Sequence, residues 1–285
     1  MPDVLTLNNV SRQFPGFALQ GISFSLEPGY IMGLVGPNGS GKTTTIKLIM
    51  NMLHRDIGTI MVDGIDNING ETEVKKRIGY VSDENIFVEE WKATDVAKAL
   101  ALYYETFDYK KFKENLHRFD LSDNKRIKDF SRGMKTRLML AAALSRETRL
   151  LLLDEPTSGL DPVVRTELLD ILQDYISDGE HSVLFSTHIT TDLEKVADFI
   201  TFFYQGELIF TKNKDDVLSD FRMVKGKPDD LTDELKKSMI GLRENQMGFE
   251  GLVRTIDSAS LPAGIITGDP TLEEIVVYHT MGVKQ

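Results

Sequence analysis

The chain has 285 residues, no cysteine, and a net charge of −11 from 33 basic and 44 acidic residues. This acidic balance argues against nucleic acid as a partner, and the lack of cysteine excludes disulfides and thiolate metal sites. A hydrophobic fraction of 41% is enough to bury a real core. The N-terminus has no basic segment followed by an apolar one, and no stretch reaches the roughly 20 apolar residues that span a bilayer. We therefore expect neither a signal peptide nor a membrane helix.

The first third of the chain predicts strands followed by a loop and a helix. Residues 4–10 and 22–26 alternate apolar and polar positions, and the turn residues Glu27-Pro28-Gly29 follow them. An N-terminal antiparallel region is the expected result. Residues 31–35 form a short apolar run that ends in a glycine-rich loop, and apolar residues then recur at helical spacing over 46–53.

The rest of the chain predicts a helical insertion and a parallel sheet. Helical patterns dominate from about residue 91 to 144, while apolar runs at 150–153 and 183–185 flank a helical stretch at 162–177. This is the crossover pattern of an α/β fold with a parallel sheet, and residues 201–210 predict one more hairpin. Beyond about residue 211 the sequence is charged and poor in motifs, until a short final helix with the apolar stripe Leu272, Ile275 and Val276.

A phosphate-binding loop is the strongest local signal. Residues 36–43, GPNGSGKT, match GxxxxGK[ST] between a predicted strand and a predicted helix. Glycines let backbone N–H groups close around phosphate oxygens, Lys42 reaches the β and γ phosphates, and the Thr43 hydroxyl can bind Mg²⁺. The predicted nucleotide-binding residues here are Gly36, Pro37, Asn38, Gly39, Ser40, Gly41, Lys42, Thr43 and Thr44.

Two carboxylates follow the apolar run at 150–153. Open α/β sheets place their sites at the carboxyl ends of strands, where Asp154 and Glu155 emerge. Phosphoryl transfer needs charge neutralisation and an oriented nucleophile, so we expect Asp154 to hold Mg²⁺ and Glu155 to polarise the attacking water.

Four further segments resemble, in order, the motifs of ABC transporter ATPases. IGYVSDE at 78–84 resembles the Q-loop, FSRGM at 130–134 the LSGGQ signature, SGLD at 158–161 the D-loop, and FSTHIT the segment of the switch histidine, here His188. The resemblance covers roughly residues 4–210, and TLEEIVVYH near the C-terminus is similar to the tail of exporter-type members. The resemblance to ABC ATPases implies a P-loop NTPase (RecA-like) core with an N-terminal antiparallel β subdomain and a helical subdomain at about 91–144. These parts would form an ATPase cassette of residues 1–210, followed by a small C-terminal extension of residues 211–285.

The resemblance also implies partners and residue roles. Two subunits would bind two ATP molecules head to tail, with Ser131 and Gly133 of one subunit offered to the γ-phosphate held by the other. Asp161 would belong to the same interface, and His188 would contact the γ-phosphate. Phe14 stands where the family has an adenine-stacking tyrosine, with Phe17 as a nearby alternative. Separate transmembrane permease subunits would hold the chain on the cytoplasmic face of the membrane.

Three positions depart from the family pattern. Asp83 is the best-aligned substitute for the Q-loop glutamine, an expected Mg²⁺ ligand, and a carboxylate there adds negative charge beside the phosphates. Arg132 and Met134 replace a glycine and the glutamine of the signature. These departures leave the contacts of the signature and of the Q-loop position open.

Other classes fit the sequence less well. DNA-repair relatives insert long coiled coils between the phosphate loop and the signature, ribosome-associated relatives carry two cassettes, and a P-loop kinase would lack the signature and D-loop. A nucleotide-gated regulatory subunit with little turnover is the serious alternative, although the presence of both Glu155 and His188 argues against it. We therefore expect a subunit that hydrolyses ATP with Mg²⁺ to energise transport, with export favoured.

Overall fold

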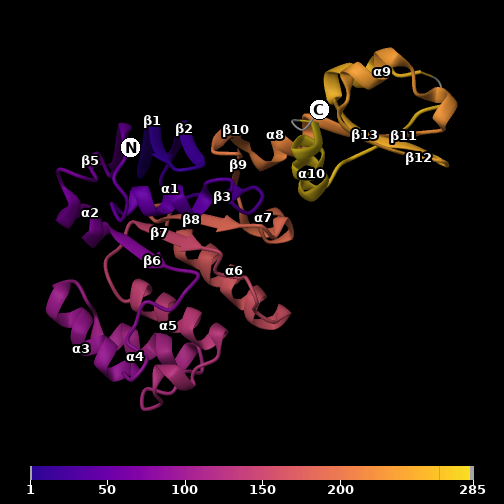
Figure 1. Cartoon of the computed structure of the whole chain (residues 1–285). Helices are drawn as coiled ribbons and strands as arrows, with labels where there is room; N and C mark the ends of the chain where they lie inside the picture. Colours follow the sequence, from indigo (N-terminus) through magenta and orange to yellow (C-terminus); the bar gives the residue numbers. More distant parts are fainter. Residues whose placement is uncertain (1, 263, 283–285) are drawn as a thin grey trace.

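The computed structural model describes residues 2–262 and 264–282, and three β-sheets organise them (Figure 1). The N-terminal sheet is antiparallel, with strand order β2-β1-β4-β5. This confirms the antiparallel region that the alternating segments predict. Its strands are β1 (Leu5–Phe14), β2 (Phe17–Leu26), β4 (Ile57–Val62) and β5 (Ile65–Asp66).

The central sheet has the strand order β10-β9-β3-β8-β7-β6, parallel except for β10, which pairs antiparallel with β9. Every residue of β3, β7 and β8 is buried, because helices or another sheet cover both faces of the sheet. The strands are β3 (Ile31–Val35), β6 (Ile78–Val81), β7 (Leu150–Asp154), β8 (Ser182–Thr187), β9 (Phe199–Tyr204) and β10 (Glu207–Asn213).

Helices cover the two faces of the central sheet unequally. Helix α1 lies between the N-terminal and central sheets, within one apolar cluster that both sheets share, whereas α5, α6 and α7 pack on the other face. Helices α3, α4 and α5 form the helical region expected between residues 91 and 144. The helices of this part are α1 (Lys42–Ile49), α2 (Glu71–Arg77), α3 (Ala93–Tyr103), α4 (Tyr109–Arg118), a 3₁₀ turn (Ile127–Asp129), α5 (Arg132–Leu144), α6 (Pro162–Ile176) and α7 (Thr190–Val196).

A third, antiparallel sheet forms after α8, where the sequence predicts no strands. Its strand order is β12-β13-β11-β14, and it lies at the end of the molecule opposite α3 and α4 (Figure 1). Helix α10 joins it to the core, because the buried residues Leu272, Ile275 and Tyr278 belong to the main apolar cluster. The elements are α8 (Lys214–Ser219), β11 (Phe221–Gly226), a 3₁₀ turn (Pro228–Asp230), α9 (Asp233–Ser238), β12 (Ile240–Asn245), β13 (Gly248–Arg254), a 3₁₀ turn (Thr255–Ser260), β14 (Ile266–Gly268) and α10 (Leu272–Gly282).

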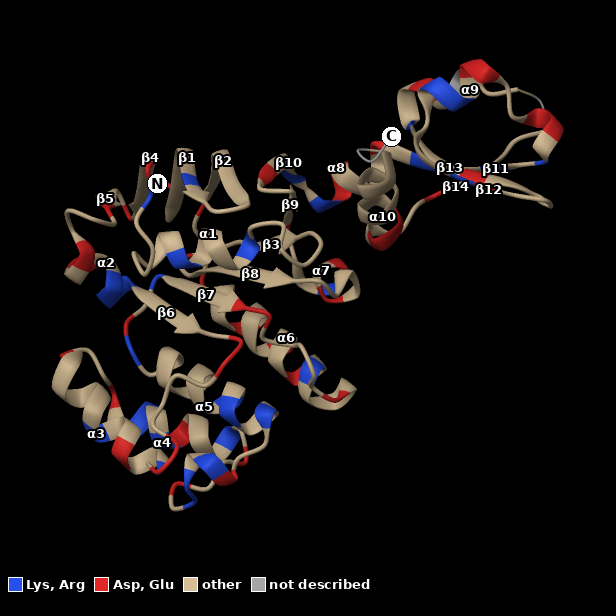
Figure 2. Ribbon diagram, in the orientation of Figure 1, with Lys and Arg blue, Asp and Glu red and all other residues tan. Residues whose placement is uncertain are grey.

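The distribution of charged residues and the character of the helices match what the composition indicates. Acidic and basic residues are interspersed over α3, α4 and α5 (Figure 2). Within residues 2–262 and 264–282, no helix combines the length and the apolar character needed to cross a membrane.

Candidate nucleotide-binding site

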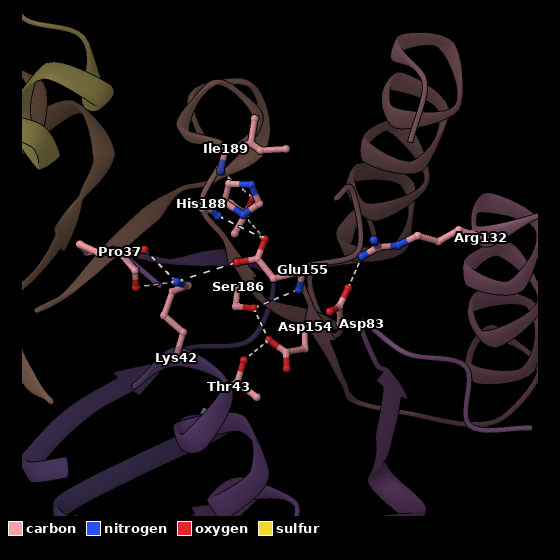
Figure 3. A network of polar contacts seen from close by, with 12 residues as sticks. Pro37, Lys42, Thr43, Asp83, Arg132, Asp154, Glu155, Ser186, His188 and Ile189 are labelled. Carbon is pink, nitrogen blue, oxygen red and sulfur yellow. Dashed lines mark hydrogen bonds and ion pairs between the residues drawn. The ribbon is translucent and has the colours of Figure 1, made fainter. Parts of the chain in front are cut away.

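The phosphate loop joins the end of β3 to the start of α1. A Cβ at Gly36 would lie 2.2 Å from the carbonyl oxygen of Phe203, so only glycine allows this close approach. Lys42 is 5% exposed, and its Nζ donates to the carbonyl oxygens of Gly36 (2.7 Å) and Pro37 (3.3 Å) (Figure 3). Burial lowers the pKa of Lys42, while Glu155 and Asp154 oppose the shift. The ammonium group of Lys42 is thus held at the phosphate loop, next to the N-terminus of α1.

A buried carboxylate lies across from the loop at the end of β7. Asp154 is 3% exposed, and its Oδ1 accepts hydrogen bonds from Thr43 Oγ1 (2.9 Å) and from Ser186 Oγ (2.6 Å). Ser186 also accepts hydrogen bonds from the backbone N–H of Glu155, both at the Ser186 Oγ (3.1 Å) and at the Ser186 carbonyl oxygen (3.0 Å). Ser186, which the sequence motifs do not single out, therefore fixes both acidic residues.

Glu155 points into the site beside His188. Its Oε2 lies 2.7 Å from Nδ1 of His188 and accepts the His188 backbone N–H at 3.3 Å, while Oε1 lies 3.9 Å from Lys42 Nζ (Figure 3). Glu155 adopts a φ of 49°, the left-handed region that side chains other than glycine seldom occupy. Such backbone strain persists where the surroundings hold it, here through the two contacts to Ser186.

A cavity of about 530 Å³ brings most of the predicted residues together. Its lining includes Phe17 but not Phe14, whose ring lies 6.2 Å from that of Phe17 at the end of the β1–β2 hairpin. The alternative adenine platform, Phe17, is therefore the better placed of the two aromatic residues. The cavity is lined by Phe17, Asn38, Gly39, Ser40, Gly41, Lys42, Thr43, Thr44, Asp83, Glu155, Ser158 and His188.

Asp83 reaches this cavity but is already paired. Its carboxylate forms an ion pair with the guanidinium of Arg132 at the first turn of α5 (Figure 3). No sequence spacing indicates this contact, because the two residues are 49 positions apart. The residue that replaces the expected glutamine is thus bound to the residue that replaces a signature glycine.

Of the predicted residues that do not line the cavity, three lie at the N-termini of α5 and α6. Ser131 is the exposed N-cap of α5, where its Oγ accepts from the Met134 N–H at 3.2 Å, and Gly133 lies in the same turn. Asp161 caps α6 by accepting the N–H groups of Val163 and Val164, each at 3.1 Å. The structure of one chain does not bring Ser131, Gly133 and Asp161 to the phosphate loop.

The donor set fits phosphate and Mg²⁺. The buried Ser40 Oγ has no hydrogen-bond partner within the described residues, and Ser40 lines the cavity. Thr43 and Asp154 supply the hard oxygen atoms that Mg²⁺ prefers, and no group of three or more acidic or histidine side chains suited to a metal occurs in the described ranges. The Thr43 and Asp154 oxygens match the usual binding of Mg²⁺ by one or two protein oxygens together with substrate phosphates.

Comparison with known proteins agrees with this geometry. The family model described as "ABC transporter" matches residues 19–158. The ABC transporter ATP-binding protein YtrB of Bacillus subtilis is 31% identical over 219 residues, 76% of this chain and 75% of that protein. The lantibiotic transport ATP-binding protein SrtF of Streptococcus pyogenes is 32% identical over 215 residues, 74% of this chain and 92% of that protein.

A solved structure supports the same relationship. The structure of an ATP-binding subunit of an ABC transporter superimposes with a TM-score of 0.69 at 25% identity, covering 75% of this chain and 91% of the other. Sequence relatives, family model and fold thus agree over the part of the chain that carries the phosphate loop and the acidic pair. This chain belongs to the ATP-binding subunits of ABC transporters, which are ATPases.

Proposed function

We propose that two copies of this subunit, or this chain and a second ATPase subunit, hydrolyse Mg²⁺-ATP at two shared sites. In each site one chain supplies the phosphate loop, Asp154, Glu155 and His188. The other supplies Ser131, Gly133 and the loop that ends at Asp161. The carrying observation is that the first group lines or borders one cavity, whereas the second group lies outside it on exposed helix N-termini.

The chemistry follows from the positions of the side chains. Lys42 and the N–H groups of the loop are placed to bind the phosphates, and the carboxylate of Glu155 is placed to accept a proton from an attacking water. His188 holds that carboxylate through the 2.7 Å contact. Mg²⁺ held by Thr43 and Asp154 would neutralise charge on the β and γ phosphates. Phe17 is the proposed platform for adenine, and Asp83 could reach the ion only if it left Arg132.

Membrane subunits have an apolar groove available. A cavity of about 260 Å³ between α2, β6, α3, α5 and the segment that follows α1 includes Met52, Ile86 and Phe87 in its lining, and Met52 and Ile86 are 51% and 54% exposed. Exposed apolar surface of this kind indicates a protein contact. We propose that an amphipathic helix of a permease subunit binds here, which would place the chain on the cytoplasmic face of the membrane.

Export is the direction that we propose. The supporting points are the exporter-like residues TLEEIVVYH of α10 and the likeness to SrtF, a lantibiotic transport protein. Neither identifies the cargo, because the path of the cargo lies in the membrane subunits.

The test is ATP turnover of the purified chain with and without Mg²⁺, compared with Glu155→Gln, together with the mass of each protein in ATP by light scattering. We expect turnover in the wild type only with Mg²⁺, and an inactive variant that ATP traps as a dimer. Binding without turnover, even with membrane subunits present, would instead indicate the nucleotide-gated regulatory subunit. A variant that stays monomeric in ATP would contradict the shared sites.

A further inference from the structure

Arg132 lies where three segments of the ATPase meet. It is the first residue of α5, directly after Ser131, and its guanidinium pairs with Asp83 on the segment that follows β6 (Figure 3). It also packs on the loop that follows Glu155, because a Cβ at Gly159 would lie 3.4 Å from Arg132 Nη1 and 3.6 Å from its Cδ. One side chain thus contacts both loops that border the nucleotide site.

Asp83 is shared by two neighbouring cavities. It lines the nucleotide cavity, and it also lines a second cavity of about 490 Å³ whose wall includes Glu89, Arg132 and Lys135. Arg132 does not line the nucleotide cavity, so its guanidinium reaches Asp83 from the second one. The positive charge is therefore placed behind Asp83, on the side away from the phosphates.

We propose that Arg132 is a positioning residue of the ATPase reaction, which neutralises Asp83 beside the phosphates and ties the signature end of α5 to the nucleotide site. The inference rests on the proposed function, because Ser131 acts there on a second ATP. It explains why a carboxylate is tolerated at the position of the usual glutamine: the two departures from the family pattern compensate each other.

The charge balance of the cavity supports the first role. The cavity and its border carry the carboxylates of Asp83, Asp154 and Glu155 and one buried ammonium, Lys42. A bound nucleotide adds several negative charges, and like charges at short range oppose binding. An ion pair with Arg132 removes the net charge of Asp83, the carboxylate that neither Thr43 nor Lys42 contacts in the structure.

The contacts of α5 support the second role. Gly133 packs against Leu160, since a Cβ at Gly133 would lie 3.2 Å from Leu160 Cδ2, and Lys135 pairs with Glu89 at 2.6 Å. The first turn of α5 is therefore held on one side by the 158–161 loop and on the other by residues 83–89. A change at Asp83 on nucleotide binding would be transmitted to Ser131 through Arg132.

The experiment is a double-mutant cycle on the full chain, with ATP affinity measured by calorimetry in EDTA so that neither turnover nor Mg²⁺ contributes. We expect Arg132→Gln to weaken ATP binding by about fivefold to tenfold at low salt, because Asp83 is left unpaired beside the phosphates. The loss should shrink in high salt, since both side chains are about half exposed. Asp83→Asn should not weaken binding, and the double variant should recover the affinity of the wild type.

The second proposed role of Arg132, the tether between the first turn of α5 and Asp83, is measured by turnover, and the double-mutant cycle has a separate control. The double variant is expected to bind ATP normally but to turn over Mg²⁺-ATP more slowly, since the first turn of α5 has lost its ion pair to Asp83; this separates kcat from KM. Lys135→Gln removes one positive charge from the same turn of α5 without touching Asp83, and ATP affinity should not change. Melting temperatures of all variants would establish that they fold.

Results that contradict the role of Arg132 differ from results that contradict the proposed ATP hydrolysis. Unchanged ATP affinity of Arg132→Gln, or a loss that Asp83→Asn does not rescue, would overturn the role in neutralisation. Normal turnover of the double variant would overturn the tether. A wild type that binds ATP without hydrolysing it would contradict the proposed function, while the binding cycle in EDTA would still decide whether Arg132 neutralises Asp83.

Discussion

Removing the Ser186 hydroxyl tests how the two acidic residues are held. Ser186 is fully buried on β8, donates to Asp154 at 2.6 Å and accepts the N–H of Glu155 at 3.1 Å. Hydrogen bonds to charged groups contribute about 1.5–3 kcal/mol, so we expect Ser186→Ala to lower the free energy of unfolding by about 2 kcal/mol. Turnover should also fall, because the Asp154 carboxylate loses one of its two hydrogen-bond donors. The Glu155 backbone N–H also loses one of its two acceptors on Ser186.

The same strand offers a matched control. Ser182 is also fully buried and also makes two hydrogen bonds, but its partners are neutral backbone groups, the Glu27 carbonyl oxygen and the Gly29 N–H, each at 3.0 Å. Ser182→Ala should cost about 1 kcal/mol, the usual size for neutral hydrogen bonds, and should leave turnover unchanged. Urea unfolding and steady-state ATPase assays measure both quantities. Equal stability losses and equal turnover in the two variants would refute the reasoning.

Two further predictions concern Lys42 and His279. Lys42→Met should weaken ATP binding by about 2–5 kcal/mol, because it removes a buried cation and leaves Glu155 uncompensated; a loss below tenfold in a fluorescence titration would contradict this. Burial lowers the pKa of His279, opposed by its hydrogen bond to the Ile275 carbonyl and aided by the nearby Arg254. Because the unfolded chain binds more protons than the folded chain between the lowered pKa and about 6.5, stability should rise with pH through this window and fall on acidification. His279→Phe should therefore flatten the dependence of the melting temperature on pH between pH 5.5 and 7.5, and an unchanged slope would contradict this.

Local signals gave the correct outline of the catalytic core. The phosphate loop is readable because its glycines, lysine and threonine act within eight consecutive residues, and β3 and β7 are readable because strands buried on both faces are continuous apolar runs. The resemblance to ABC ATPases added His188, whose Nδ1 lies 2.7 Å from Oε2 of Glu155 in the structure.

Other features depend on contacts between distant residues. The third sheet escaped prediction because its strands mix charged and apolar residues, as in FRMVKG and IGLREN, and gain their order by antiparallel pairing and packing on α10. That Phe17 and not Phe14 lines the cavity depends on how the β1–β2 hairpin meets the phosphate loop.

The sequence by itself determined the family, the phosphate loop and the acidic pair, because short segments carry these features whole. Only the tertiary structure decided that Ser186 holds the Asp154 carboxylate and the Glu155 backbone, and that Arg132 pairs with Asp83. Those contacts join residues 31 to 49 positions apart, and no periodicity or spacing along the chain encodes which side chains a fold brings together across such distances.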